Sequence, residues 1–257
     1  MKYDYQAGIT VYTCISGMYD KISPLSNGEY QDVSCICFSD YEYSAGLGWH
    51  YHTFESPRRL TNGHDINRYH KIFPQRVLRG CRYSVYVDGN IRYIGSYRKL
   101  VEEFRKSGAA LGAFRHPEKR TIKEEAEACQ KQGKFDKYDL ARIDHQMEFY
   151  SEEGLNLNAP VTANYLLVRD NMHPRLQIAM SLWWSQLFEF TKRDQLSLNY
   201  VLWKMQVPWV FLDDLKDVHE SDLVRLSHNR PIWHCVRSRL MKIYQSFWDV
   251  NQKLETK

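Results

Sequence analysis

The stretch that decides the fold runs from Tyr83 to Gly95 and reads YSVYVDGNIRYIG. Its first part, Tyr83 to Val87, is rich in β-branched and aromatic residues, which predicts a buried strand. That strand ends directly at Asp88-Gly89-Asn90, and strand character resumes from Ile91 to Ile94. A hydrophobic strand followed at once by polar residues and glycine is typical of an α/β sheet, in which ligands bind beyond the strand ends.

Similar apolar runs occur on both sides of this stretch. Near-continuous apolar strands that alternate with helical patterns favour a mainly parallel sheet flanked by helices on both faces. The last run contains Pro208, which cannot donate to a sheet ladder, so we expect that strand at an edge. The other predicted strands are Ile9 to Ile15, Val33 to Phe38, Ala110 to Phe114, Asn164 to Val168 and Val207 to Leu212.

Helical patterns fill the intervals between these strands. One pattern begins at Asn62-Gly63 and continues to Val77, and Pro74 should kink or split it. From Thr121 to Glu153 the chain is charged and helical with a break near Gly133, which indicates a partly exposed helical pair. The other predicted helices are Ser96 to Lys106, His173 to Phe190 and Asp194 to Met205.

Length and composition are those of an ordinary globular protein. The chain has 257 residues, 43% of them hydrophobic and 26% charged, which excludes a disordered or fibrous class. One α/β domain over residues 1–257 is the simplest organisation at this length. It would contain a helical insertion at about 121–155 and a basic C-terminal helical segment at about 235–257.

Targeting and redox signals favour a cytoplasmic protein. The longest mostly apolar stretch, Ile178 to Phe188, is shorter than the roughly 20 residues that cross a bilayer. Asp4 and Gln6 stand where an apolar signal core would begin, so we expect no secretion by that route. The six cysteines include no CxxC pair, and Cys35 and Cys37, on one face of a strand, are expected in the core.

The charge distribution says more about partners than the net charge does. A net charge of +4 is too small to indicate a nucleic-acid partner. Basic residues gather between Arg225 and Lys242 with only neutral residues among them. Such a run suits a diphosphate or the inner face of a membrane, to which the protein would bind peripherally, and a solvated helix face is the alternative.

Polar residues recur where strands stop. Asp40 follows the strand that ends at Phe38, Asp88 and Asn90 follow the next one, and Arg115-His116 follow the strand after that. These positions should converge on one cleft at the carboxyl ends of the strands. Asp88 and Asn90 can there hold a hard divalent cation whose other ligands are phosphate oxygens. The alternative is a hairpin, because Asp-Gly is also favoured in type I′ turns.

Two further acidic motifs stand at expected helix starts. Asp194, in Asp194-Gln195, is well placed to cap its helix, a role worth about 1 kcal/mol. Glu124 and Glu125 are weaker candidates for a site, because adjacent acids on a helix face different ways and one is usually solvated.

Several motifs in a fixed order resemble one family. Arg68-Tyr69-His70-Lys71-Ile72 precedes the central stretch, and FRHPEKRTIKEEAEAC and KRDQLSLNYVLWK follow it. The most distinctive pieces are the strand ending in Asp88-Gly89, the turn His116-Pro117-x-x-Arg120 and the helix start Arg193-Asp194-Gln195. From Val11 to about Pro208 the chain resembles the domain-of-unknown-function 616 family. That family is regarded as glycosyltransferase-like and occurs in plant wall and mucilage proteins and in bacterial proteins of surface-polysaccharide loci.

The resemblance implies a Rossmann-like fold of the GT-A kind and a nucleotide-diphosphate sugar as donor. An Asp-x-Asp motif in that fold binds a divalent metal, Mn²⁺ or Mg²⁺, together with the donor diphosphate, and Asp88 and Asn90 stand at its place. Asn90 departs from the motif, and a neutral amide is a weaker ligand than a carboxylate. Fixed cations can replace a metal at a leaving diphosphate. The available ones are Lys71, Arg68, Arg115 and Arg120.

The resemblance also implies roles for residues outside that motif. An Asp-Gln pair at such a helix start faces the donor sugar, which makes Asp194 and Gln195 the expected catalytic residues. A histidine near the C-terminal end often completes the metal or diphosphate site, a role that falls on His234, for which a helix-start or core position beside Trp233 is the alternative. Asp40 and His116 belong to the expected donor-binding cleft.

The implied function is sugar transfer to a hydroxyl of a saccharide or lipid-linked saccharide, in bacterial capsular or lipopolysaccharide synthesis. One alternative is a metal-dependent hydrolase that uses Asp88, His116 and Asp194, although no dense ligand spacing such as HExxH supports it. The other is a nucleotide-sugar-binding module without turnover, for which Asn90 is the best indication.

Overall fold

The computed structural model of the protein describes residues 8–17, 19–20, 22, 24–25, 33–41, 48–55, 57, 60–131 and 135–226. Its centre is a seven-stranded sheet with the order β3-β2-β1-β4-β7-β6-β8. Neighbouring strands are parallel except at β7, which is antiparallel to β4 and β6. The strands are β1 Ile9–Ile15, β2 Ser34–Ser39, β3 His50–His52, β4 Tyr83–Val87, β6 Leu111–Arg115, β7 Thr162–Asp170 and β8 Trp209–Phe211.

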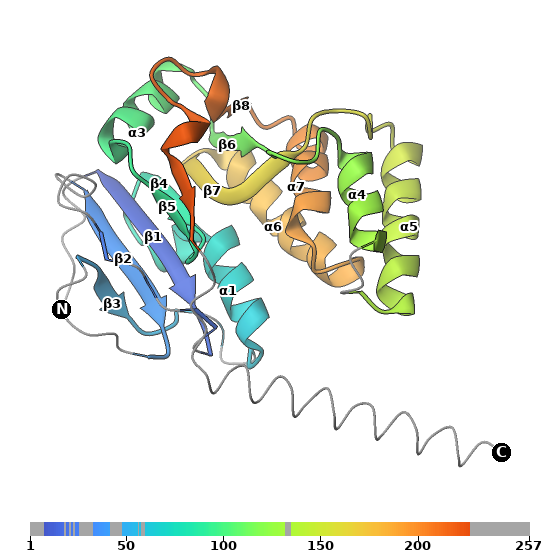
Figure 1. Cartoon of the computed structure of the whole chain (residues 1–257), viewed down its shortest axis with the longest axis horizontal. Helices are drawn as coiled ribbons and strands as arrows, with labels where there is room; N and C mark the ends of the chain where they lie inside the picture. The colour runs from blue at the N-terminus through green and yellow to red at the C-terminus, as the bar shows by residue number, and fades with distance from the viewer. Residues whose placement is uncertain are drawn as a thin grey trace, which may run out of the picture.

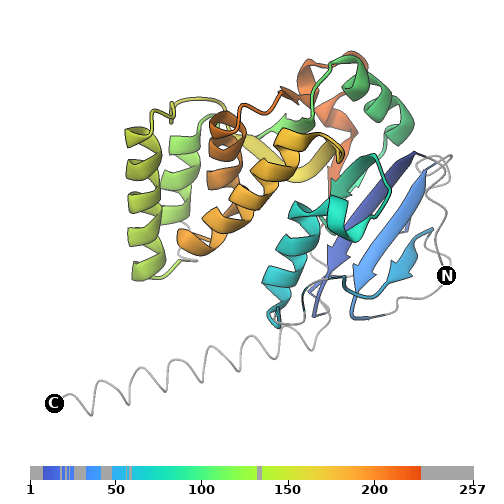
Figure 2. The ribbon, with the colours of Figure 1, turned by 180° about the vertical axis from the view of Figure 1, so that it is seen from behind.

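Helices cover the sheet and extend beyond it on one side, where α4 and α5 stand next to α7 (Figures 1 and 2). No helix in the described ranges is long and apolar enough to span a membrane. The helices are α1 Gly63–Ile72, α2 Pro74–Val77, α3 Tyr97–Lys106, α4 Ile122–Lys131, α5 Lys137–Glu152, α6 Pro174–Glu189 and α7 Asp194–Lys204. Two short 3₁₀ turns, Leu212–Asp214 and Glu220–Asp222, follow β8.

Alternate side chains of the sheet enter two cores, as expected for strands that are covered on both faces. On one face, Tyr12 of β1 packs with apolar residues of α1, α6 and α7. On the other face, Val11 packs with residues of α3 such as Phe104. The helices that begin or end near the strand ends are therefore α1 and α7, on the same face. The expected mainly parallel α/β sheet is confirmed.

The helix patterns are confirmed in type and nearly in length. Asn62 caps α1 by accepting a hydrogen bond from the N–H of His64, and Pro74 splits the helical stretch by starting α2. The charged segment forms α4 and α5. β8 lies at the edge of the sheet, as Pro208 predicted. Strands β3 and β9 (Leu223–Arg225) were not predicted, because three residues give too little pattern to detect.

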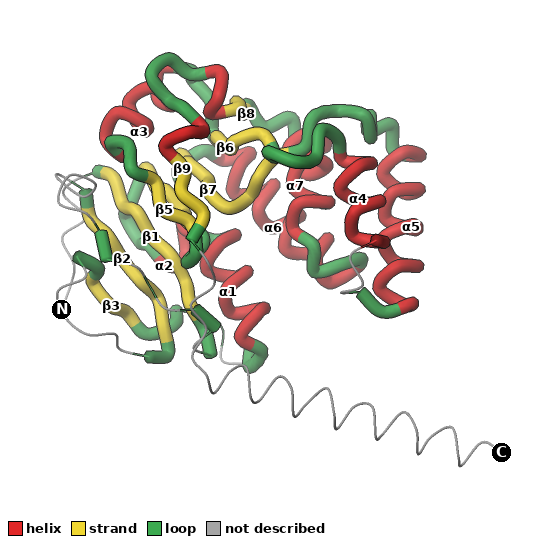
Figure 3. The backbone as a smooth tube through the Cα atoms, in the orientation of Figure 1, coloured by secondary structure: helices red, strands yellow, loops and turns green. Residues whose placement is uncertain are grey.

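The polar stretch after β4 does not make a hairpin. Ile91–Tyr93 forms β5, which pairs with β9 in a separate two-stranded sheet (Figure 3). The N–H of Ile91 donates to the carbonyl of Asp88 over 2.9 Å, so residues 88–91 do form a turn. Neither Gly89 nor Asn90 has a positive φ, which excludes type I′. The turn carries the chain out of the main sheet at the end of β4.

The cysteines of the described part belong to the core. Cys35 and Cys37 are buried on β2, as expected. The described ranges contain no disulfide, and burial raises the pKa of the Cys37 thiol to about 12. These thiols therefore act as small apolar side chains.

Candidate functional site

A buried ammonium group occupies the centre of the candidate site. Lys71, near the end of α1, is 1% exposed. Its Nζ lies 2.8 Å from Asp194 Oδ2 and 3.5 Å from Asp88 Oδ1. Arg68 lies one turn earlier on the same face of α1 and places Nη2 3.3 Å from Asp194 Oδ1. We call these four residues, Arg68, Lys71, Asp88 and Asp194, the Lys71 cluster.

Three distant parts of the chain build this cluster. Asp88 follows β4 and Asp194 is the first residue of α7, while α1 supplies both cations. The ends of β4 and α1 meet because the sheet sets β4 beside β1, against which α1 packs. The sequence prediction brought Asp88, Lys71, Arg68 and Asp194 to one cleft, and the structure brings these four together.

A second buried cation, Arg169, fixes the end of α1. Arg169, on β7, donates from Nη1 to the carbonyl of Lys71 over 2.5 Å and from Nη2 to Tyr12 Oη over 2.9 Å. The Tyr12 hydroxyl in turn donates to the carbonyl of His70 over 3.1 Å. A positive charge at a helix C-terminus is favourable, because the last carbonyls carry partial negative charge. The backbone that carries Lys71 is therefore held rigidly.

The environment of Asp194 keeps its carboxylate ionised. Burial raises the pKa of this group, but the charges of Arg68 and Lys71 outweigh burial and hold the pKa well below its usual range. The side chain does not cap α7: Arg193 occupies the cap position, and no side chain caps the helix there. Its two oxygens face cations of α1 instead, so the capping alternative is wrong.

Asp88 combines a fixed side with an accessible side. The Tyr86 hydroxyl donates to Asp88 Oδ1 over 2.8 Å, and burial keeps the pKa of Tyr86 well above its usual value, so the hydroxyl remains a donor. The side chain of Asp88 is nevertheless 32% exposed, which leaves the carboxylate open to a ligand. A Cβ at Gly89 would lie 3.0 Å from Ile15 Cδ1, so a larger residue there would require the Ile15 side chain to shift.

The residues present fit a cation that a bound phosphate helps to hold. Asp88 is partly exposed and Asn90 half-buried on the same turn, and Mg²⁺ or Mn²⁺ commonly binds one or two protein oxygens together with substrate phosphates. Among the residues that the structure places, no three His, Cys, Asp or Glu side chains gather as metal ligands. His234, the expected third ligand, lies outside the described residues, as does the basic C-terminal segment at about 235–257.

A second ionic group lies next to the first. Glu125 of α4 is 1% exposed and accepts from Arg193 Nε over 2.7 Å, with Arg193 Nη2 at 2.6 Å. His116 Nε2 lies 3.8 Å from the same carboxylate. Glu124 faces outward and accepts from the N–H of Arg120, so the two adjacent acids diverge as predicted. Because Arg193 directly precedes Asp194, this group fixes the start of α7.

His116 is a neutral part of this second group. Its Nδ1 accepts from the N–H groups of Glu118 and Lys119 at 3.2 and 3.0 Å, so its proton lies on Nε2, toward Glu125. Burial lowers the pKa of His116 more than Glu125 raises it. The imidazole therefore acts as a hydrogen-bond donor near neutral pH.

The remaining candidates make contacts elsewhere. The carboxylate of Asp40 accepts from the N–H of Gly17 at 2.9 and 3.1 Å, which joins the ends of β1 and β2. Arg115 forms two hydrogen bonds with Asp214, at 2.9 and 2.8 Å. Arg120 is exposed and forms no ion pair within the described ranges.

Gln195 offers an unused hydrogen-bond acceptor beside Asp194. Its Oε1 is buried and has no hydrogen-bond partner among the described residues. Buried polar atoms without a partner are costly, and this one belongs to the residue that directly follows Asp194 of the Lys71 cluster. Gln195 thus fits the role that the resemblance implies for it.

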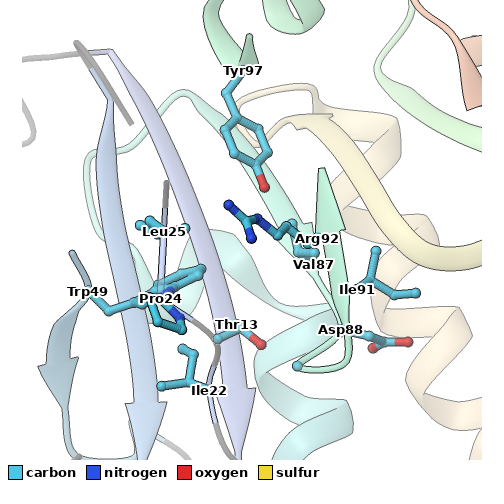
Figure 4. Close-up of a pocket in the computed structure, with 11 residues that line it drawn as sticks. Thr13, Ile22, Pro24, Leu25, Trp49, Val87, Asp88, Ile91, Arg92 and Tyr97 are labelled. Atoms are coloured by element: carbon cyan, nitrogen blue, oxygen red, sulfur yellow. The ribbon is translucent and has the colours of Figure 1, made fainter. Parts of the chain in front are cut away.

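A small cavity lies on the other side of Asp88 (Figure 4). Thr13 of β1 contributes to it from one side, and Trp49, Arg92 and Tyr97 surround it. Its volume of about 20 Å³ is far below the size of a nucleotide site. This cavity beside Asp88 is therefore too small to hold a nucleotide sugar.

Sequence reasoning missed the residues that position the cluster. Arg169 and Tyr12 stand in apolar strands, where a strand pattern gives no indication of hydrogen bonds to a distant helix end. An arginine directly after the apolar residues YLLV was the available signal, because a buried arginine needs several acceptors. Tyr86 had the same kind of signal, a hydroxyl two residues before Asp88 on one face of β4.

Fold and site together define a glycosyltransferase-like protein. Residues 49–228 match the TOD1/MUCI70 glycosyltransferase-like domain, and the chain belongs to that family. A relative from Arabidopsis thaliana, described as probable hexosyltransferase MUCI70, is 28% identical in an alignment of 181 positions that covers 63% of this chain. The match spans 30% of that longer relative.

One solved glycosyltransferase structure shares the fold. The bifunctional glycosyltransferase WbbM matches with a TM-score of 0.50 and 9% identity, over 82% of this chain and 40% of WbbM. Mouse xyloside xylosyltransferase 1 matches with a TM-score of 0.48 and 11% identity, over 79% of this chain and 84% of that one. At such low identity the WbbM match shows the arrangement of the sheet and helices, and nothing about substrates.

Proposed function

We propose that this chain transfers a hexosyl group from a nucleotide-diphosphate sugar to an acceptor hydroxyl in polysaccharide synthesis. The supporting observation is the Lys71 cluster, in which the buried Lys71 and the partly buried Arg68 meet two carboxylates beside the carboxyl end of β4. Membership of a glycosyltransferase-like family supports the same reaction class.

The cluster supplies the charges that this reaction needs. Negative charge builds on the departing diphosphate while the sugar becomes oxocarbenium-like. Lys71 and Arg68 would provide fixed positive charge near the diphosphate, and the ionised Asp194 would provide negative charge near the sugar. Because its pKa is low, Asp194 is a weak proton acceptor. We therefore assign Asp194 to binding sugar hydroxyls or stabilising the anomeric centre rather than to general base catalysis.

A divalent metal is part of the proposal. Asp88 and Asn90 would hold it together with the diphosphate, and His234 would complete the site. When bound, the cation would neutralise charge on the leaving group. Gln195 would accept a hydrogen bond from the donor sugar, because its Oε1 is unused. Asp40 and His116 would act on the donor through the loops and helix start that they hold in place.

The positions of the side chains do not support the alternative of a metal-dependent hydrolase. Its three residues, Asp88, His116 and Asp194, do not form a metal-binding group among the described residues. His116 contacts Glu125 and its own turn instead.

The proposal extends to the acceptor and the cellular setting. We propose a saccharide or lipid-linked saccharide of the cell surface as acceptor, with the chain on the cytoplasmic side of a membrane. The basic run between Arg225 and Lys242 would provide the peripheral contact.

The test is turnover with a panel of nucleotide sugars, with and without candidate acceptor saccharides. Release of nucleotide that depends on both the sugar and an acceptor is the expected result. Cleavage of phosphate esters without any sugar requirement would show a hydrolase. Binding of nucleotide sugars without release under any condition would show a binding module, and stabilisation by uridine, guanosine or cytidine diphosphate would identify the base.

A further inference from the structure

A second cavity lies beyond the Lys71 cluster, at the far end of α7. It has a volume of about 430 Å³ and is bounded by the C-terminal half of α7, by β8 and by the loop after α5. This volume is in the range of roughly 300–1,000 Å³ that is typical of ligand sites. At a rise of about 1.5 Å per residue, Trp203 lies roughly 14 Å along α7 from Asp194. The cavity is therefore separate from the proposed transfer site.

The walls of this cavity combine indole rings with amides. Trp203, which is 40% exposed, and the half-buried Trp209 contribute their rings. The amides of Asn156 and Gln206 also line it. The Gln206 side chain and Asn156 Nδ2 form no hydrogen bond with another described residue, so they are free to bind hydroxyl groups. None of the described residues that line the cavity is charged, which favours a neutral ligand with apolar faces and hydroxyl edges.

The backbone at Gln206 gives an independent indication. The N–H of Val207 donates to the carbonyl of Leu202 and that of Gln206 to the carbonyl of Trp203, at 2.9 and 3.0 Å. These two bonds form a Schellman motif, in which the residue at the position of Gln206 is usually glycine. Gln206 adopts φ 48° there, so its side chain is present at a cost in stability. A glutamine in a glycine position, on the wall of a cavity, points to a role for its amide.

We propose that this cavity binds a neutral oligosaccharide, with sugar rings against Trp203 and Trp209 and hydroxyl groups on Gln206 and Asn156. The aromatic rings and uncharged amides of the walls favour a saccharide. That this saccharide is part of the acceptor rests on the proposed function. The ion pair between Lys204 and Glu153 joins the ends of α7 and α5 beside the cavity and keeps its two sides together.

The test is titration of the whole chain with cellohexaose, xylohexaose, mannohexaose and maltohexaose, followed by tryptophan fluorescence and calorimetry. At least one hexasaccharide should bind, and Trp203→Ala should weaken that binding at least tenfold. Gln206→Gly should weaken it several-fold while the melting temperature stays equal or rises, because glycine relieves the backbone. Tyr138→Ala, which removes an exposed ring elsewhere on α5, is the matched control and should bind like the wild type.

Two outcomes would overturn the proposal. One is that none of the four hexasaccharides binds at millimolar concentration, and the other is that Trp203→Ala and Gln206→Gly bind like the wild type. Asp88→Asn separates this proposal from the proposed function. If that variant lacks transfer but still binds the hexasaccharide, the two sites act independently, and if the wild type binds without transferring, only the proposed function fails.

Discussion

The carboxylate of Asp194 stays ionised because α1 faces it with two cations. Its carboxylate is 3% exposed, and an isolated carboxylate at such depth would take up a proton. Arg68 and Lys71 prevent this by standing within 3.3 Å of its oxygens. The same contacts hold the Lys71 ammonium, so each charge depends on the others being present.

We expect Asp194→Asn to lower the transfer rate by orders of magnitude. The fold should lose about 3 kcal/mol, because the variant leaves buried cations short of a partner. Since the folded pKa of Asp194 is lowered, its contribution to stability is complete above the unfolded value and is lost as the pH falls through the folded one. Urea unfolding from pH 7 down to pH 2 should therefore show a weaker acid dependence in the variant. The exposed Asp144→Asn should match the wild type in rate and stability, and a near-wild-type rate for Asp194→Asn would remove it from the catalytic residues.

Asp88 should matter for the donor rather than for the fold. Asp88→Ala should abolish binding of nucleoside diphosphates in calorimetry, because it removes the accessible carboxylate at the end of β4. Its circular dichroism should be unchanged, since the turn is made by backbone atoms of Asp88 and Ile91. Asp170→Asn, at the opposite end of the sheet, is the control. Equal affinity in Asp88→Ala and wild type would leave Asp88 with a turn role only.

At the scale of elements, α7 is the part that the site depends on. Its first residue is held by α1, and the residue before that is held by Glu125 of α4. Below this contact, Ala126 and Ile143 of the helical pair pack against Leu196 of α7. The helical pair, which looks like a peripheral insertion in sequence, thus supports the start of α7.

Glu125→Gln tests this support. Because Arg193 would lose its buried carboxylate, we expect a loss of about 3 kcal/mol in stability and a fall in kcat through displacement of Asp194. The neighbouring Glu124→Gln is the matched control, since Glu124 is exposed and contacts only the backbone N–H of Arg120. Its effect should stay below about 1 kcal/mol. Equal kcat in both variants would limit Glu125 to a purely structural role.

Element types could be predicted because they depend on local patterns, whereas the relations between elements could not. The run at β7 was recognised as a strand, but its antiparallel direction depends on which strands it joins. The convergence of Asp88 with Lys71 and Asp194 followed from the strand-end rule together with the family resemblance. The role of Arg169 did not, because its acceptor is the carbonyl of a residue 98 positions away.

At the scale of the whole molecule, the site joins β4, α1 and α7. A ligand that binds across these elements stabilises all of them at once. The proposed metal site belongs to this scale too, because its expected ligands, Asp88 and His234, are far apart in the chain.

We expect the melting temperature to rise with a nucleoside diphosphate and Mn²⁺, and to rise less when a chelator replaces the metal. His234→Ala should reduce the rise most with Mn²⁺, because imidazole is a better ligand for Mn²⁺ than for Mg²⁺. If the histidine donates to the diphosphate instead, wild-type affinity should strengthen as the pH falls through about 6.5. Affinity equal to wild type with Mn²⁺, with Mg²⁺ and with chelator would exclude both roles for His234.

The buried guanidinium of Arg169 also has a consequence for how the chain folds. Its partners in the described part of the chain are the carbonyl of Lys71 and the hydroxyl of Tyr12, 98 and 157 positions away, and it has no carboxylate partner there. Until α1 and β1 are both in place, burying the Arg169 guanidinium under β7 would leave it without acceptors. That would cost several kcal/mol. The three elements therefore open and close as one cooperative unit. Fraying of the end of α1 that presents Lys71 would remove one of the two described acceptors of Arg169 while the sheet stays formed.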